Sequence, residues 1–212
     1  MDFTVRLFAD GGSTVVEQAI GWNGSSLDHN PRHTTENGLP LAMPYVFLDG
    51  AVTMSAADPW GMGFERWALE LGDQAQEAIV LVADPRAVAD GCGNAPAPAD
   101  AEALARRLES DPDLQVAPPV AISLGAVDGL QMDVVLAPQA SECPVLRPAG
   151  DSNTRRAANL DLSTRMRLYL VDLPEGSASR IMAIAIVAPE ARFDSVLEAA
   201  TPIIDSIQFH AP

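Results

Sequence analysis

The chain has 212 residues, of which 48% are hydrophobic and 20% are charged, a globular composition with enough apolar residues for one sizeable core. It carries 29 acidic against 13 basic residues. The net charge of −16 argues strongly against nucleic acid or an anionic membrane surface as a partner, because phosphate contacts require a basic face. No run of about 18 apolar residues occurs, so no membrane span is predicted. We expect a single domain over residues 1–212.

Short apolar segments separated by turns make up the first part of the chain. Residues 3–20 predict an opening hairpin, and a second hairpin is predicted around Asp49-Gly50, a dipeptide typical of two-residue hairpin turns. Between the two hairpins, residues 21–40 are rich in Gly, Asn, Ser and Pro, and they predict a long loop. Residues 64–71 then fit a short helix.

The middle of the chain predicts a helix followed by two strands. Residues 78–99 form a short apolar strand and then a proline-containing connection. Asp100 is a good N-cap for the helix that follows. Apolar residues alternate with others over 120–124 and again over 130–136, so we expect two strands there, with a turn at 127–129.

The last quarter of the chain is its most apolar part. A polar stretch over residues 137–163 predicts a second long loop. Residues 165–170 alternate, so one face of that strand enters a core while its two arginines stay in water. Residues 181–187 are apolar on both faces, which suits a central strand covered on both sides.

A second helix is predicted from Phe193 onward by the helical spacing of apolar residues. Pro202 should kink or end this helix, because it removes a backbone donor, and the chain should then return to extended structure. Consecutive strands joined by short turns imply a largely antiparallel sheet whose faces the few helices cover. The predicted class is α+β, an α/β/α sandwich.

Several segments between residues 81 and 209 carry a resemblance through their order and spacing: 89–92 (ADGC), 100–104 (DAEAL), 111–116 (DPDLQV), 129–133 (GLQMD), 142–144 (ECP), 166–172 (MRLYLVD) and 202–209 (PIIDSIQF). Together they resemble a family of exported or membrane-tethered actinobacterial and chloroflexal domains with the PsbP-like fold, which LpqN-type lipoproteins share. The resemblance implies an antiparallel sheet between helices. It also implies a domain that binds partners and is not an enzyme, so it supplies no catalytic residue.

The two cysteines, Cys92 and Cys143, occupy positions that the resembling family pairs, and the resemblance therefore suggests a disulfide. Such a bond would close a loop of about fifty residues, stabilise the fold by about 4 kcal/mol, and imply an oxidising compartment. Residues 1–12 do not form a signal peptide, so an exported protein would need a signal or lipid anchor upstream. The alternative is a cytosolic protein with two unpaired cysteines.

A possible metal site lies in the first loop, where Asp28, His29 and His33 fall within six residues. On a helix the two histidines would share a face, but Pro31 lies between them in a loop-like segment. These residues could serve a metal-dependent hydrolase. The alternative is a pair of solvent-exposed histidines in a loop.

Four aromatic residues could line a pocket for an apolar ligand: Trp22, Trp60, Phe64 and Trp67. The alternative is that they pack in the core beneath the sheet. No cofactor is predicted.

The leading functional interpretation is a non-enzymatic, exported or cell-envelope domain that binds a protein partner or a small apolar ligand. Its alternatives are the metal-dependent hydrolase and a structural accessory module of a larger envelope protein. The sequence does not name the partner.

Overall fold

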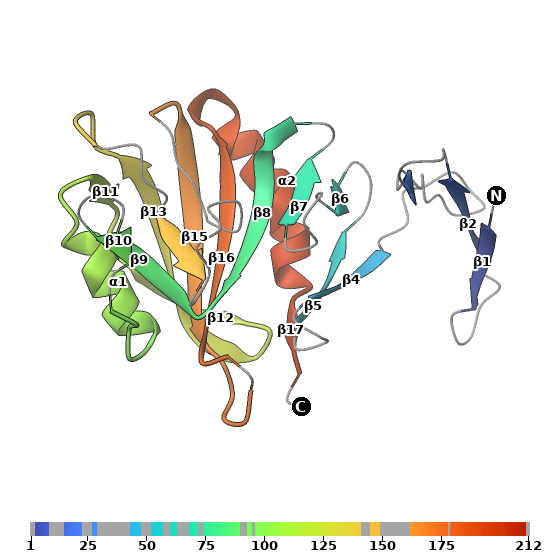
Figure 1. Cartoon of the computed structure of the whole chain (residues 1–212), viewed down its shortest axis with the longest axis horizontal. Helices are drawn as coiled ribbons and strands as arrows, with labels where there is room; N and C mark the ends of the chain where they lie inside the picture. The colour runs from blue at the N-terminus through green and yellow to red at the C-terminus, as the bar shows by residue number, and fades with distance from the viewer. Residues whose placement is uncertain are drawn as a thin grey trace.

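The computed structural model of the chain describes residues 3–8, 15–22, 27–28, 43–47, 52–56, 60–62, 68–71, 74–89, 93–94, 96–140, 145–148, 162–177 and 179–210. Its centre is an eight-stranded antiparallel sheet with the strand order β11-β13-β15-β16-β8-β7-β6, in which β12 also pairs with β13 (Figure 1). The strands of this sheet are β6 (Trp60–Met62), β7 (Ala68–Leu71), β8 (Gln74–Ala83), β11 (Leu114–Val116), β12 (Val120–Leu124), β13 (Val127–Leu136), β15 (Thr164–Asp172) and β16 (Ile181–Pro189).

Three smaller antiparallel sheets accompany the central one. The N-terminal sheet consists of β1 (Phe3–Phe8), β2 (Val15–Trp22) and β3 (Leu27–Asp28). In a second sheet, β4 (Met43–Phe47) and β5 (Val52–Ala56) pair with the C-terminal β17 (Gln208–Phe209). The third sheet has β9 (Pro85–Ala89) between β10 (Gly93–Asn94) and β14 (Leu146–Pro148).

Two helices cover opposite faces of the central sheet, as the sequence predicts. Helix α1 (Ala101–Glu109) begins after Asp100, whose Oδ1 accepts a hydrogen bond from the Ala103 amide at 2.6 Å, so the predicted N-cap is confirmed. Helix α2 (Phe193–Asp205) follows the short 3-10 helix η4 (Glu190–Arg192). The α+β class with an antiparallel sheet between helices is therefore confirmed.

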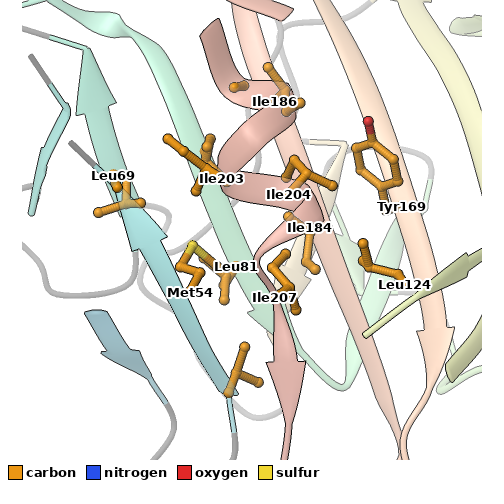
Figure 2. Close-up of a cluster of buried hydrophobic side chains, with 14 of the residues drawn as sticks. Met54, Leu69, Leu81, Leu124, Tyr169, Ile184, Ile186, Ile203, Ile204 and Ile207 are labelled. Atoms are coloured by element: carbon orange, nitrogen blue, oxygen red, sulfur yellow. The ribbon is translucent and has the colours of Figure 1, made fainter. Parts of the chain in front are cut away.

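Strand β16 separates two hydrophobic cores, because its side chains are buried on both faces. Ala183 and Ala185 belong to the core beneath α1, whereas Ile184 and Ile186 belong to the core beneath α2. Figure 2 shows the second core, in which apolar side chains of α2, β16, β5 and β7 meet. The prediction of a central strand at 181–187 is confirmed.

The turn between β12 and β13 is not where the sequence predicts it. Gly125 and Ala126 connect the strands with φ values of +54° and +65°, the backbone of a type I′ hairpin turn. The expected turn at 127–129 is wrong, because those residues already belong to β13. At Gly129 a Cβ atom would meet the Leu170 carbonyl oxygen at 2.5 Å, so this glycine allows the close approach of β15 and does not form a turn.

Five further expectations also need correction. Residues 68–71 of the expected short helix form strand β7, which pairs with β8. The connection expected before α1 contains β9 and β10, and the loops expected at 21–40 and 137–163 contain β3 and β14. Helix α2 runs through Pro202 to Asp205, because Ile203 and Ile204 are both buried in the core beneath it and hold its last turn against the sheet.

Candidate functional site

The face of the central sheet that carries α2 has a buried part and an open part. Alternation along β15 places Arg165 and Arg167 on this face, while Met166 and Leu168 point into the core beneath α1. Asp133 of β13 lies directly opposite Arg167 in the register of the two strands. The polar side chains of β13 and β15 therefore meet beside the helix, at the border of its core.

Asp133 holds both arginines in a fixed geometry. Arg167 forms a two-pronged ion pair with it, with Nε at 2.7 Å from Oδ1 and Nη2 at 2.9 Å from Oδ2. Arg165 Nη2 donates to the same Oδ2 at 2.7 Å. The three side chains are only 18% (Asp133), 22% (Arg167) and 31% (Arg165) exposed, so water screens them weakly. We call these three residues the arginine–aspartate cluster.

The ion pairs of the cluster shift the pKa values of Asp133 and Arg167. Burial raises the pKa of the Asp133 carboxyl, but hydrogen bonds from Arg167 and Arg165 and their charges outweigh it, so the pKa lies below the ordinary value of 3.8. The hydrogen bond to Asp133 raises the pKa of the Arg167 guanidinium. Burial raises the pKa of Tyr169, the next residue on this face of β15, above its ordinary value of 10.0, against the lowering effect of Arg167. At neutral pH the cluster therefore carries two positive charges and one negative charge.

Arg165 is further fixed by the first residue of α2. Its guanidinium carbon lies 4.6 Å from the centre of the Phe193 ring, within the range of a cation–π interaction. On the solvent side its Nη1 lies 3.8 Å from Glu190, beyond hydrogen-bond length, and Glu190 is exposed. Arg165 thus keeps donor capacity toward solvent while its position is set by Asp133 and Phe193.

The arginine–aspartate cluster borders an open groove of about 290 Å³. Its lining residues come from β11 and the residue that follows it, and from β13, β15 and η4: Gln115, Val116, Ala117, Asp133, Val135, Arg165 and Glu190. The edge of the sheet is irregular there, since Val116 pairs with Val134 but Val120 pairs with Gln131. One extra residue is thus accommodated at Pro118-Pro119, a β-bulge at the sheet edge.

A second ion pair fixes the start of α2 to the sheet. Glu77 of β8 is 3% exposed, and its Oε1 lies 3.0 Å from Nε of Arg192, at the end of η4. A buried carboxylate needs such a partner, because an unpaired buried charge is costly. This pair and the Arg165–Phe193 contact together hold the end of η4 and the start of α2 against the sheet, and Glu190 at the start of η4 lines the groove.

A prediction on pH dependence follows from the lowered pKa of Asp133. Its stabilising contribution is complete above the ordinary value of 3.8 and is lost as the pH falls through the lower value of the folded state. We expect the free energy of unfolding to fall with acidification more steeply for the wild type than for Asp133→Asn. Urea unfolding of both proteins at pH values above and below 3.8 measures the difference. Equal pH dependence of the two proteins would contradict the assignment.

The residues that the sequence proposed for a site lie mostly outside the described part of the chain. This holds for Cys92, Cys143, His29 and His33, and for Phe64 and Trp67. The backbones of Trp22 and Asp28 lie in β2 and β3. The Trp60 side chain is buried in the core beneath α2. Within the described ranges, no three His, Cys, Asp or Glu residues lie close enough to hold a metal ion.

The sequence did not single out the arginine–aspartate cluster as a site. The signal available was the alternation of β15, which predicts Arg165 and Arg167 on one face, but it does not tell which acid they meet. That information is contained in the register between β13 and β15.

The comparisons with known proteins concern the fold. No protein-family profile and no curated protein matches the sequence. One similar solved structure is cyanobacterial PsbP (CyanoP) from Synechocystis sp. PCC 6803, at 8% identity over 84% of this chain and 98% of that one, with a TM-score of 0.44. Another is LpqN of Mycobacterium tuberculosis, which is involved in cell envelope biogenesis. It matches at 14% identity over 86% of this chain and 100% of the LpqN chain, with a TM-score of 0.47.

Both solved structures bear names of the group that the sequence resembles. At these identities the likeness says nothing of function, which has to be argued from the residues of this chain. In the described part of the chain, no helix is both long and apolar enough to cross a membrane.

Proposed function

We propose that this chain is a non-enzymatic, exported domain of the cell envelope that binds a protein partner in the groove beside the arginine–aspartate cluster. Four of the seven lining residues are polar or charged, and they come from three strands and η4. This lining favours a polar segment of a protein over the small apolar ligand that the aromatic residues had suggested.

The observation that carries the proposal is the fixed guanidinium of Arg165. Its ion pair with Asp133 and its contact with Phe193 hold it in place before any partner arrives. A preorganised arginine loses little conformational entropy on binding, and arginine is enriched among the residues that dominate binding energy at interfaces. The partner would place an acceptor group, such as a carboxylate or a backbone carbonyl, against the solvent side of this side chain.

Site-specific photocrosslinking in the producing cells tests the proposed function. A photoreactive amino acid is introduced at position 115, which lines the groove. As a control, the same amino acid is introduced at position 109 of α1, which packs on the opposite face of the sheet. We expect a discrete covalent adduct from position 115 only, and we expect Arg165→Gln to abolish it. Adducts of equal yield from both positions, or none from position 115, would contradict the proposal.

The disulfide between Cys92 and Cys143 is part of the same proposal, because export places the chain in an oxidising compartment. Its support from the described residues is topological. Strand β10 begins directly after Cys92, and β14 begins shortly after Cys143. Both strands pair with β9, one on each side of it, so each cysteine is close in sequence to a strand of the same small sheet.

The mass of the exported protein after alkylation, with and without prior reduction, tests this bond. We expect two added labels only in the reduced sample, because a disulfide has no free thiolate to react. Two labels without reduction would refute the bond and would favour the cytosolic alternative. This result is independent of the crosslinking experiment, which depends on the groove alone.

A further inference from the structure

The outermost strand next to the groove offers a binding edge of its own. Strand β12 pairs with β13 on one side, and none of the described strands pairs with its other side. A free strand edge is a row of backbone donors and acceptors that another extended chain can satisfy. Natural proteins usually protect such edges with charged residues, but Val120–Leu124 (VAISL) contains none.

The hairpin turn determines which backbone groups point outward. In a two-residue turn, the flanking residues Leu124 and Val127 are hydrogen-bonded to each other. Hydrogen-bonded and non-hydrogen-bonded pairs then alternate along the ladder. Ala121 and Ser123 belong to non-hydrogen-bonded pairs, so their N–H and C=O groups face away from β13, and both residues are exposed.

The two faces of this edge differ in chemistry. Val120, Ile122 and Leu124 lie on the face that carries α2; Leu124 is buried there, while Val120 is 57% exposed. On the other face, Ser123 lies opposite the exposed Asp128. An added strand would therefore meet apolar neighbours on one face and an acidic neighbour on the other. The net charge of −16 further favours a basic partner.

We propose that β12 is extended by an antiparallel strand from a partner protein whose apolar and basic residues alternate. The apolar residues of that strand pack against Val120 and Ile122, and its basic residues lie beside Ala121 and Ser123 and point toward Asp128. The Pro118-Pro119 bulge ends the pairing, because proline has no N–H to offer. The proposal goes beyond the groove, since it uses backbone groups and not the arginine–aspartate cluster.

The register makes a sharp test possible with a labelled peptide of sequence Lys-Val-Lys-Val-Lys-Val-Lys as the probe. In antiparallel addition, the residues opposite Ala121 and Ser123 are the lysines, so lysine N–H groups face β12 and valine N–H groups face solvent. We expect N-methylation of the lysines to weaken binding at least tenfold, because it removes the two backbone hydrogen bonds that lysine N–H groups donate to the Ala121 and Ser123 carbonyls. N-methylation of the valines leaves charge and side chains the same, and binding should persist.

A matched pair of protein variants supplies the second measurement. Ala121→Pro removes one outward N–H without touching the β12–β13 ladder, whereas Ala121→Thr keeps that donor. We expect several-fold weaker peptide binding for Ala121→Pro and unchanged binding for Ala121→Thr. If Ala121→Pro does not fold, the comparison of the two N-methylated peptides still tests the proposal, because it uses the wild-type protein. Absence of binding by the unmodified peptide, or equal binding of both N-methylated peptides, overturns the proposal. Equal binding would mean that charge alone attracts the peptide.

Discussion

Replacing Asp133 with alanine should lower the free energy of unfolding by about 3 kcal/mol, because it leaves two partly buried guanidinium groups side by side without a counter-ion. Both groups depend on this carboxylate, which accepts hydrogen bonds of 2.7–2.9 Å from them. The loss would exceed that of an ordinary surface ion pair, for which about 1 kcal/mol is the upper range. Urea unfolding of the variant and the wild type at neutral pH measures it.

Asp128→Ala is the matched control, since Asp128 lies on the same strand but is exposed and points to the other face of the sheet. We expect this change to alter stability by about 0.5 kcal/mol or less. A variant in which Asp133, Arg165 and Arg167 are all replaced by leucine should recover much of the lost stability, because apolar residues often replace a buried ion cluster without loss. Equal stability of Asp133→Ala and Asp128→Ala would show that the cluster contributes little.

Replacing Phe193 with alanine should destabilise the fold by about 3–5 kcal/mol, the usual range for deleting a buried phenylalanine ring. Phe193 is 1% exposed and is the first residue of α2, so its ring joins the start of the helix to the core. The same ring lies under the guanidinium of Arg165. Thermal or urea unfolding measures the loss.

Phe193→Leu separates the two roles of this side chain. Leucine fills part of the volume and should cost less stability than alanine, but it provides no ring for Arg165. We therefore expect Phe193→Leu to remain folded and to reduce the crosslinking yield from position 115. Full crosslinking in folded Phe193→Leu would show that the ring does not position Arg165 for binding.

Local signals in the sequence predict those elements whose reasons are local. The Asp100 side chain caps α1, as its position before an amphipathic stretch indicates. Residues 181–189 form a central strand, because a strand that is apolar on both faces needs a layer of structure packed against each face. The antiparallel pairing of residues 43–47 with 52–56 agrees with the Asp49-Gly50 signal between two apolar segments.

The errors occur where tertiary contacts outweigh local preference. Asp128-Gly129 looks like a hairpin turn, but Gly129 is needed where β13 and β15 approach too closely for a Cβ atom. Ala126 instead adopts the left-handed backbone of the turn, with φ of +65°, an uncommon conformation for a residue with a Cβ atom. Similarly, Pro202 does not end α2, because burial of the next two residues offsets the cost of its missing donor.

The candidate site is harder to predict than the fold elements, because it depends on a register. Asp133 and Arg167 belong to strands separated by more than twenty-five residues of sequence, and no spacing rule relates them. Alternation within β15 indicates that its arginines share a face, and no more. Only the pairing of β13 with β15 brings the carboxylate opposite the guanidinium groups.

The pairing of β16 with β8 has a consequence for how the chain is made. β16 lies about one hundred residues after β8, so the centre of the sheet consists of contacts distant in sequence, which favours slow folding. At a synthesis rate of about 5–20 residues per second, β8 is synthesised several seconds before β16, the strand with which it pairs. The nascent chain therefore stays without its central sheet until its last quarter has been made. In that state the apolar residues of β8 have no strand β16 to cover them, so they remain accessible to chaperones.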